Sequence, residues 1–248
     1  MEKFFNINYE FDKQEVRRII NDIPKGYICV ADGVVMNTAN RDKEYLDVVN
    51  GGLFSICDSS WVPLYLKSIY GKIYEQYCGA EIFKDIVTSR KYRMIFMGTS
   101  QPTLNVLQRE LKEMNPDVEG MSFVELPFRD VEDFDYPEIA TMIEDDGAKI
   151  IWVALGAPKQ ERFMNKLLPY LKSGVMIGVG AVFKFYSGTE ESRCPQWIQK
   201  HHMEFLYRIW QDPKKQIKRC FWIVVTLPKL YFQEYKRAKQ NKTVVNQS

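Results

Sequence analysis

Short apolar runs rich in β-branched and aromatic residues alternate along this chain with segments of helical periodicity, and this alternation restricts the fold more than any other feature. Such an alternation is typical of a mostly parallel sheet flanked by helices. The predicted strands are residues 27–31, 53–57, 92–97, 122–126, 149–155 and 175–179. The predicted helices are residues 34–49, 61–70, 102–114, 136–144 and 159–171. We therefore expect an α/β fold.

Charge divides the chain into two parts. Residues 195–248 hold 11 Lys/Arg against 3 Asp/Glu, whereas the preceding 194 residues hold 23 basic and 29 acidic side chains. We expect a core over residues 1–194 and a helical, aromatic, basic appendage over residues 195–248. A basic appendage indicates an anionic partner, and charge alone leaves nucleic acid and acidic lipid open. Amphipathic helices on a membrane surface and packed helices with a solvated basic face are both open interpretations.

Composition indicates a protein of the reducing cytoplasm. The chain has 5 cysteines, an odd number with no CxxC pair, so neither a disulfide framework nor a zinc ribbon is expected. No apolar run approaches the roughly 20 residues of a membrane-spanning helix. We expect no signal peptide either, because no apolar run followed by a cleavage site opens the chain.

Candidate functional residues follow the predicted strands, because ligands of open α/β sheets bind beyond the carboxyl ends of the strands. The loops there begin at Asp32, Asp58, Gly98, Gly156 and Gly180. Asp58 lies directly after a predicted strand, where a carboxylate can act as a general base. The alternative is that Asp58 or Ser59 caps the helix that begins at Trp61.

The segment Gly156-Ala157-Pro158-Lys159-Gln160-Glu161 joins the most apolar strand to a helix. Backbone N–H groups at that helix start would bind a phosphate, and Gln160 could hydrogen-bond a base or a sugar. An ordinary turn, with Lys159 on the surface, is the alternative.

Three other sequence patterns give only weak evidence for a functional site. Gly178-Val179-Gly180 lacks the third glycine and the acidic residue of a dinucleotide fingerprint, which disfavours NAD binding. Asp133-Phe134-Asp135 looks like a metal-binding DxD motif, but its acidic surroundings favour a solvated helix start. The adjacent His201 and His202 cannot both face one metal on a helix, because ligands there recur at three or four residues. We expect no metal and no cofactor.

Three segments together resemble the WecG/TagA/CpsF glycosyltransferases, glycosyltransferase family 26. They are KIIWVALGAPKQE (149–161), VMIGVGAVFKFYSG (175–188) and PQWIQKHHMEFLYRIWQDPKKQIKR (195–219). The resemblance spans residues 25–220 and is looser in the N-terminal half. It implies a Rossmann-like core and an inverting, metal-independent enzyme. Such an enzyme moves N-acetylmannosamine, its uronic acid or glucose from a UDP-sugar to an undecaprenyl-diphosphate-linked saccharide.

The resemblance also implies roles for individual residues. Asp58 matches the proposed catalytic base, Gln160 a donor-pocket residue and Arg208 the arginine of the family's LYR motif. Lys215, in the same basic segment, is a second candidate cation for the diphosphate. The chain departs from the family pattern at Val30-Ala31-Asp32, at the residues after Asp58, and at Lys184, where the family has aspartate; these departures bear on the donor.

The resemblance thus implies a transferase of cell-surface polysaccharide synthesis (capsule, exopolysaccharide or teichoic acid). It would be cytoplasmic and peripheral on the inner face of an anionic membrane, with no nucleic acid as partner. A homo-oligomer stays open. The alternative from a different class is a non-enzymatic α/β module that binds a nucleotide or a polyanion, which would not need Asp58 or Gln160.

Overall fold

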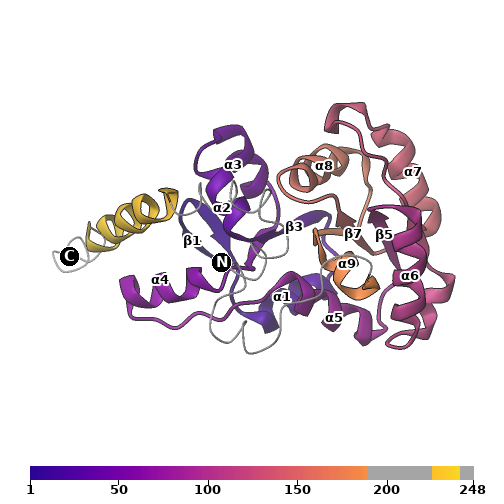
Figure 1. Cartoon of the computed structure of the whole chain (residues 1–248), viewed down its shortest axis with the longest axis horizontal. Coiled ribbons are helices and arrows are strands. Elements are labelled where there is room, and N and C mark those ends of the chain that lie inside the picture. Colours follow the sequence, from indigo (N-terminus) through magenta and orange to yellow (C-terminus); the bar gives the residue numbers. More distant parts are fainter. Residues whose placement is uncertain (189–224, 241–248) are drawn as a thin grey trace.

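The computed structural model describes residues 1–188 and 225–240, and its centre is one eight-stranded sheet. The strand order is β1-β2-β4-β3-β8-β7-β5-β6, and only the β1–β2 pair is antiparallel. The strands are β1 (Glu2–Phe4), β2 (Ile7–Tyr9), β3 (Gly26–Ala31), β4 (Phe54–Cys57), β5 (Met94–Gly98), β6 (Ser122–Val124), β7 (Ile150–Ala154) and β8 (Val175–Gly178). The expected mostly parallel α/β fold is confirmed (Figure 1).

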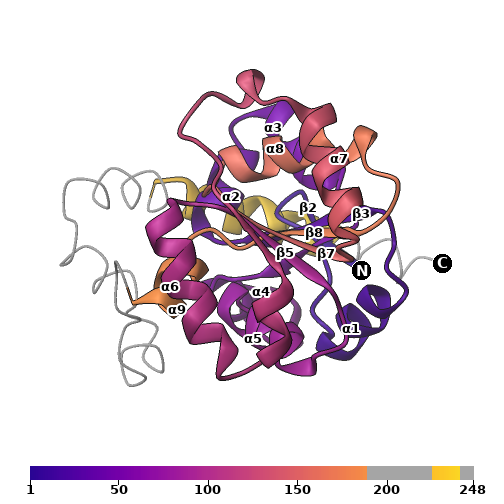
Figure 2. The same cartoon turned by 90° about the vertical axis from the view of Figure 1, so that its right-hand side faces the viewer.

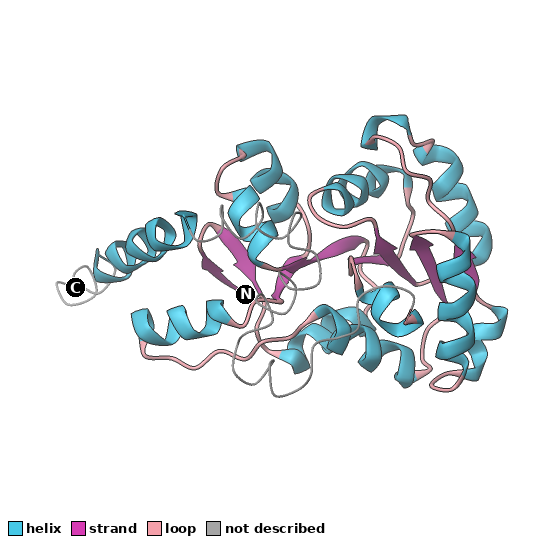
Figure 3. Cartoon of the chain, in the orientation of Figure 1, coloured by secondary structure: helices cyan, strands magenta, loops and turns pink. Residues whose placement is uncertain are grey.

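Helices cover both faces of this sheet (Figures 1 and 2). One face carries α2 (Gly33–Ala39), α3 (Lys43–Asn50), α7 (Tyr136–Asp146) and α8 (Lys159–Leu167). The other carries α1 (Lys13–Asn21), α5 (Gly79–Ser89), α6 (Gln101–Lys112) and α9 (Val182–Ser187). Figure 3 shows the resulting arrangement of strands between two helical layers. None of the helices in residues 1–188 and 225–240 is long and apolar enough to cross a membrane.

The central strands are apolar on both sides, which is why their sequences read as continuous hydrophobic runs rather than alternating ones. In β7, Trp152 packs toward α5 and α6, whereas its neighbours Ile151 and Val153 pack toward α8. All five residues of β7 are buried. The strongest predicted strand is therefore an interior strand of the sheet.

Two further helices complete the N-terminal edge. Helix α4 (Trp61–Tyr70) lies near β1 and β2, and residues 225–240 form a C-terminal helix beside it (Figure 1). Glu234 of that helix is 4% exposed and accepts hydrogen bonds from the Phe5 backbone N–H (2.8 Å) and the Tyr70 hydroxyl (2.7 Å). The predicted boundary near residue 195 lies outside the described residues.

The six predicted strands are confirmed within a few residues, but the single helix predicted over residues 34–49 is wrong. The chain forms α2, turns at Asn40-Arg41-Asp42, and then forms α3. The Asp42 side chain accepts a hydrogen bond from the Tyr45 N–H (3.1 Å), and so caps a new helix where apolar periodicity alone suggested continuation.

Among the strands and α-helices of residues 1–188, five have no counterpart in the sequence prediction: β1, β2, α1, α5 and α9. Strands β1 and β2 have three residues each, too few for a periodic pattern. Helix α1 does have a start signal in the sequence: Asp12 caps it by accepting from the N–H groups of Gln14 and Glu15.

Candidate active site

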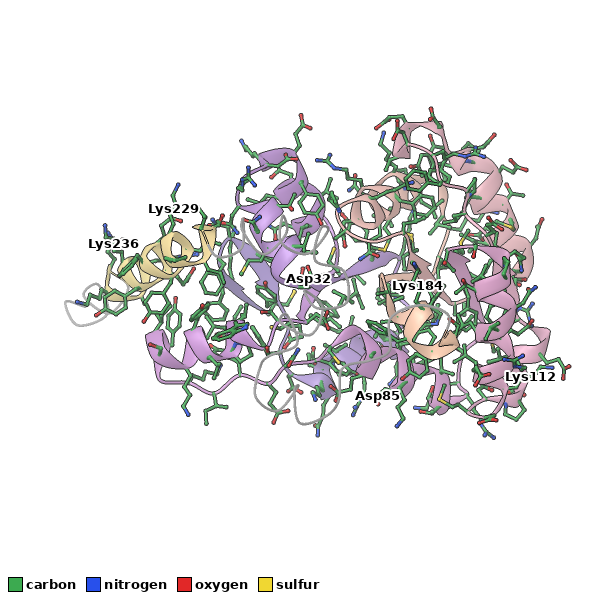
Figure 4. All side chains as sticks on the ribbon, viewed as in Figure 1. Asp32, Asp85, Lys112, Lys184, Lys229 and Lys236 are labelled. Atoms are coloured by element: carbon green, nitrogen blue, oxygen red, sulfur yellow. The ribbon has the colours of Figure 1, made fainter. Side chains whose placement is uncertain are left out.

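The candidate site lies at the carboxyl edge of the sheet, where neighbouring strands send their following helices to opposite faces. Strands β3 and β8 are adjacent and parallel, yet α2 leaves β3 on one face and α9 leaves β8 on the other. A crevice for ligands forms at such a point in open α/β sheets. Figure 4 shows Asp32, just after β3, and Lys184, on α9, at this edge.

Asp32 and Asp58 lie at the ends of neighbouring strands. Ala31 of β3 pairs in register with Cys57 of β4, so the two acidic residues directly follow a matched pair. The Asp58 backbone N–H also bonds the Ala31 carbonyl (3.1 Å), which extends the ladder up to the site. The sequence prediction that both residues reach this edge is confirmed.

Asp58 caps a helix, but not the helix expected. Its Oδ1 accepts a hydrogen bond from the backbone N–H of Gly79, the first residue of α5, at 2.9 Å. The Gln76 side chain donates to its carbonyl oxygen (3.0 Å). Helix α4, which begins at Trp61, has no side-chain cap. The local interpretation, in which Asp58 or Ser59 caps α4, is therefore wrong, because a segment 21 residues away in sequence supplies the bonding partner.

Asp32 is the N-cap of α2. Its Oδ1 accepts hydrogen bonds from the N–H groups of Val34 (2.8 Å) and Val35 (2.9 Å). That carboxylate is therefore fixed at the amino end of a helix, where negative charge is stabilised. Because both bonds go to Oδ1, a ligand could bind this carboxylate through its other oxygen. Its predicted contact with substrate stays a prediction.

A pocket of about 330 Å³ opens along the same edge of the sheet, over the ends of β5, β7 and β8 and the loop after β6. Its charged lining residues are Lys159, Lys184 and Glu125. Its other lining residues are Thr99, Ser100, Leu126, Pro127, Phe128, Ala154, Leu155, Gly180 and Phe183. Of the predicted substrate-binding residues, Lys159 and Gly180 line this pocket, whereas Asp32 and Asp58 do not. The edge thus has an acidic side at β3–β4 and a more basic side at β5–β8.

Gly98 has a structural reason to be glycine. Its φ is +123°, and a Cβ there would lie 2.6 Å from the Ala154 carbonyl oxygen of the neighbouring strand. Any side chain would push β5 and β7 apart directly beneath the pocket. Its predicted role in substrate binding is untested.

The turn from Gly156 to Gln160 follows β7 as expected, but the Gln160 side chain points into the protein. It is 3% exposed; its Oε1 accepts from the Gly156 N–H (3.2 Å), and its Nε2 donates to Glu161 Oε1 (2.8 Å). Pro158 follows Ala157 and is the N-cap residue of α8, and its side chain makes no capping hydrogen bond. Direct contact of Gln160 and the turn amides with a donor stays a prediction.

Lys159 points toward the loop after β6. Its ammonium group donates to the Arg129 carbonyl oxygen and lies 5.0 Å from the centre of the Phe128 ring, which is fully exposed. Phe128 therefore places an aromatic surface beside a cation at the pocket rim. Its place at the rim could not be predicted, because a lone phenylalanine in a loop has no distinctive sequence pattern.

Glu161, the last residue of the Gly156–Glu161 segment, is a buried carboxyl group for which the sequence predicted no role of its own. It is fully buried, and its Oε2 accepts a hydrogen bond from the Tyr45 hydroxyl of α3 (2.8 Å). Burial raises the pKa of this carboxyl to about 7, and the negative charge of Asp32 acts in the same direction. The identity of Tyr45 as its partner could not be read from sequence, since 116 residues separate the two.

Two groups of predicted residues remain: the acidic segment before α7 and the candidates in the basic C-terminal part. Asp135 accepts a hydrogen bond from the Glu138 N–H (3.0 Å) and caps α7, so the acidic segment is the expected helix start. Arg208 and Lys215, with both histidines, lie outside the described residues.

Comparison with known proteins identifies the family. The model of the glycosyl transferase WecG/TagA/CpsF family matches residues 3–243. The chain belongs to this family and is a glycosyltransferase.

Several curated bacterial enzymes align over most of the chain. A protein of Bacillus subtilis (strain 168) is 24% identical over 95% of this chain and 92% of its own length. A protein of Bacillus spizizenii is 23% identical over 83% of this chain and 82% of its own length. A protein of Staphylococcus aureus (strain MW2) is 23% identical over 76% of this chain and 73% of its own length. Each is named N-acetylglucosaminyldiphosphoundecaprenol N-acetyl-beta-D-mannosaminyltransferase.

Proposed function

We propose that this glycosyltransferase moves N-acetylmannosamine from a UDP-sugar to an undecaprenyl-diphosphate-linked saccharide, by a single displacement with inversion. The observation that carries the proposal is the carboxylate of Asp58, which the Gly79 N–H fixes at the same edge of the sheet as a pocket lined by Lys159 and Lys184. The relatives named above support the choice of sugar and acceptor. The polymer made is teichoic acid or another surface polysaccharide, a capsule or an exopolysaccharide.

In this mechanism Asp58 removes the proton from the acceptor hydroxyl. The oxygen then attacks the anomeric carbon from the face opposite the leaving UDP. A positioned base of this kind contributes about 10²–10⁴-fold to the rate.

The diphosphate gains negative charge as the bond breaks, and preorganised cations stabilise it. Lys159 and Lys184 are the described cations of the pocket. Arg208 and Lys215 are assigned the same task from the resemblance. The aromatic ring of Phe128, at the pocket rim, is suited to stack on a nucleobase.

The decisive experiment measures UDP release together with sugar transfer. Purified protein is incubated with a detergent-solubilised polyprenyl-diphosphate N-acetylglucosamine acceptor and with UDP-N-acetylmannosamine, UDP-N-acetylmannosaminuronic acid or UDP-glucose. Transfer from the first donor supports the proposal. Transfer from either other donor corrects the sugar, and binding of UDP without turnover of any donor overturns the proposed reaction.

Membrane association forms the second part of the proposal, and an aromatic row supports it. Ring centres are 6.4 Å apart for Trp61 and Tyr65 of α4, 5.6 Å for Tyr65 and Tyr231, and 6.4 Å for Tyr231 and Tyr235. The row therefore runs from α4 onto the C-terminal helix. Because α4 begins three residues after Asp58, the row starts close to the proposed base.

Exposed apolar and basic side chains accompany this row. Leu64 is 41% exposed and Phe232 61% exposed, while Lys229 and Lys236 extend from the C-terminal helix away from α4 (Figure 4). Tyrosine, tryptophan and lysine together are typical of surfaces at a lipid–water interface. An anionic bilayer, rather than nucleic acid, fits this combination, because nucleic acid would not require the apolar residues.

Vesicle flotation tests the association. The protein should float with vesicles containing phosphatidylglycerol, and the Lys229→Glu/Lys236→Glu variant should float several-fold less, since each basic residue near an anionic surface contributes about 1 kcal/mol. Lys112→Glu on α6 is the matched control. Equal flotation of all three proteins would overturn the assignment of this surface.

A further inference from the structure

A buried chain of hydrogen bonds joins α3 to the turn after β7. The Tyr45 hydroxyl donates to Glu161 Oε2 (2.8 Å), Gln160 Nε2 donates to Glu161 Oε1 (2.8 Å), and the Gly156 N–H donates to Gln160 Oε1 (3.2 Å). Tyr45 and Glu161 are fully buried and Gln160 is 3% exposed. The chain of bonds therefore reaches from the interior to the backbone of the site.

Packing does not explain a carboxyl group at this position. Burying a carboxyl costs free energy unless hydrogen bonds compensate it, and an apolar residue of similar size would fill the space without that cost. The guanidinium of Arg162, the next residue of α8, forms its ion pair with Asp42 (2.6 Å) and lies over the Tyr45 ring. Glu161 thus holds its two donors, Tyr45 and Gln160, at fixed positions.

Gln160 occupies the place where the turns after β7 and β8 approach each other. A Cβ on Gly178 would lie 3.2 Å from Gln160 Cδ and Nε2, and one on Gly180 would lie 3.6 Å from Oε1 and 4.0 Å from Gly156 Cα. The carboxamide is therefore enclosed by both turns. Its orientation sets the distance between Gly156 and Gly180, and Gly180 lines the pocket.

We propose that Tyr45 and Glu161 are positioning residues for the donor pocket: they fix the Gln160 carboxamide, and through it the turns that carry Lys159 and Gly180. Neither residue touches the donor. The inference rests on the proposed function, in which this pocket binds the UDP-sugar. It extends the active site to α3, on which no substrate-binding residue was predicted.

Three variants separate positioning from simple stability. Tyr45→Phe removes one hydroxyl without changing the packing, and Glu161→Leu removes both acceptors. Glu161→Gln is the conservative rescue, because its amide can accept from Gln160 and donate to the Tyr45 oxygen. Tyr77→Phe is the matched control, since Tyr77 is equally buried and its hydroxyl also bonds a carboxylate, Asp85 (2.8 Å), on the other face of the sheet.

The first readout is steady-state kinetics of sugar transfer. We expect Tyr45→Phe and Glu161→Leu to raise the KM for the UDP-sugar about 5- to 20-fold, as the loss of one buried hydrogen bond implies. The KM for the acceptor should stay within about twofold, and Glu161→Gln should restore the donor KM to near the wild-type value. Donor KM values equal to that of Tyr77→Phe in both variants would overturn the proposal.

The second readout needs no substrate. Hydrogen exchange of the Gly156 amide should accelerate about tenfold in Tyr45→Phe, through loosening of Gln160, but not in Tyr77→Phe. Unchanged exchange in Tyr45→Phe would overturn the proposal even if activity fell. If the wild-type protein transferred no sugar, the proposed function would fail while the exchange result still decided whether these residues position the turn.

Discussion

The carboxylate of Asp58 accepts a hydrogen bond from the backbone N–H of Gly79 at 2.9 Å, although 21 residues separate them in sequence. This bond gives the proposed base a structural task at the start of α5 in addition to its proposed task in proton transfer. Two substitutions of the same residue can therefore separate the two tasks.

Asp58→Asn should abolish activity while preserving the fold. An asparagine Oδ1 still accepts from Gly79, but the side chain can no longer take a proton, so kcat should fall about 10²–10⁴-fold with little change in Tm. Asp58→Ala should lose activity and also about 1 kcal/mol of stability, because the cap is gone. Kinetics and thermal melting of both variants test this, and an active Asp58→Asn enzyme would rule out the assigned base.

Glu161 should make stability depend on pH. Its pKa is about 7 in the folded protein, mainly through burial, against about 4.3 in an unfolded chain. Between these values the folded state binds more protons, so the contribution of Glu161 to stability is fully present below about pH 4 and is lost as pH rises to 7. This contribution totals roughly 4 kcal/mol.

Urea unfolding of the wild type and of Glu161→Gln at pH 5, 6, 7 and 8 measures this effect. The free energy of unfolding of the wild type should fall relative to that of the variant between pH 5 and 7, and the difference should level off above pH 7. Parallel curves for the two proteins would show that Glu161 does not titrate in this range.

Gly98→Ala should destabilise the protein by roughly 2–4 kcal/mol, because the methyl group meets the Ala154 carbonyl and the backbone must keep a φ of +123°. Gly120→Ala is the control, since a Cβ there meets nothing within 4 Å. Chemical denaturation of the two variants compares them directly. Equal stabilities would mean that β5 and β7 can separate at this point without cost.

Glu234→Ala should release the C-terminal helix from the core. The substitution leaves the buried Phe5 N–H and the Tyr70 hydroxyl without their shared acceptor, which costs about 1–3 kcal/mol locally. Limited proteolysis should then cleave within residues 225–240 faster than in the wild type. Lys236→Ala, an exposed position on the same helix, should cleave at the wild-type rate.

The order of strands and helices could be predicted in large part because apolar runs such as residues 149–155 need both faces of a sheet to be covered. Local pattern failed where a polar side chain overrode apolar periodicity, as Asp42 does between α2 and α3. It also failed where an element was too short to show a period, as in β1 and β2.

The candidate site, like the fold, could be predicted from the sequence only in part. The sequence by itself determined that Asp32, Asp58, Gly98, Gly156 and Gly180 end strands of a parallel sheet, since the chain direction of such a sheet brings those ends to one edge. Only the tertiary structure decided that Asp58 bonds to Gly79, and that Gln160 turns inward to Glu161 and Tyr45. Those partners are distant in sequence, and hydrogen bonds between distant residues arise from packing, which no local periodicity encodes.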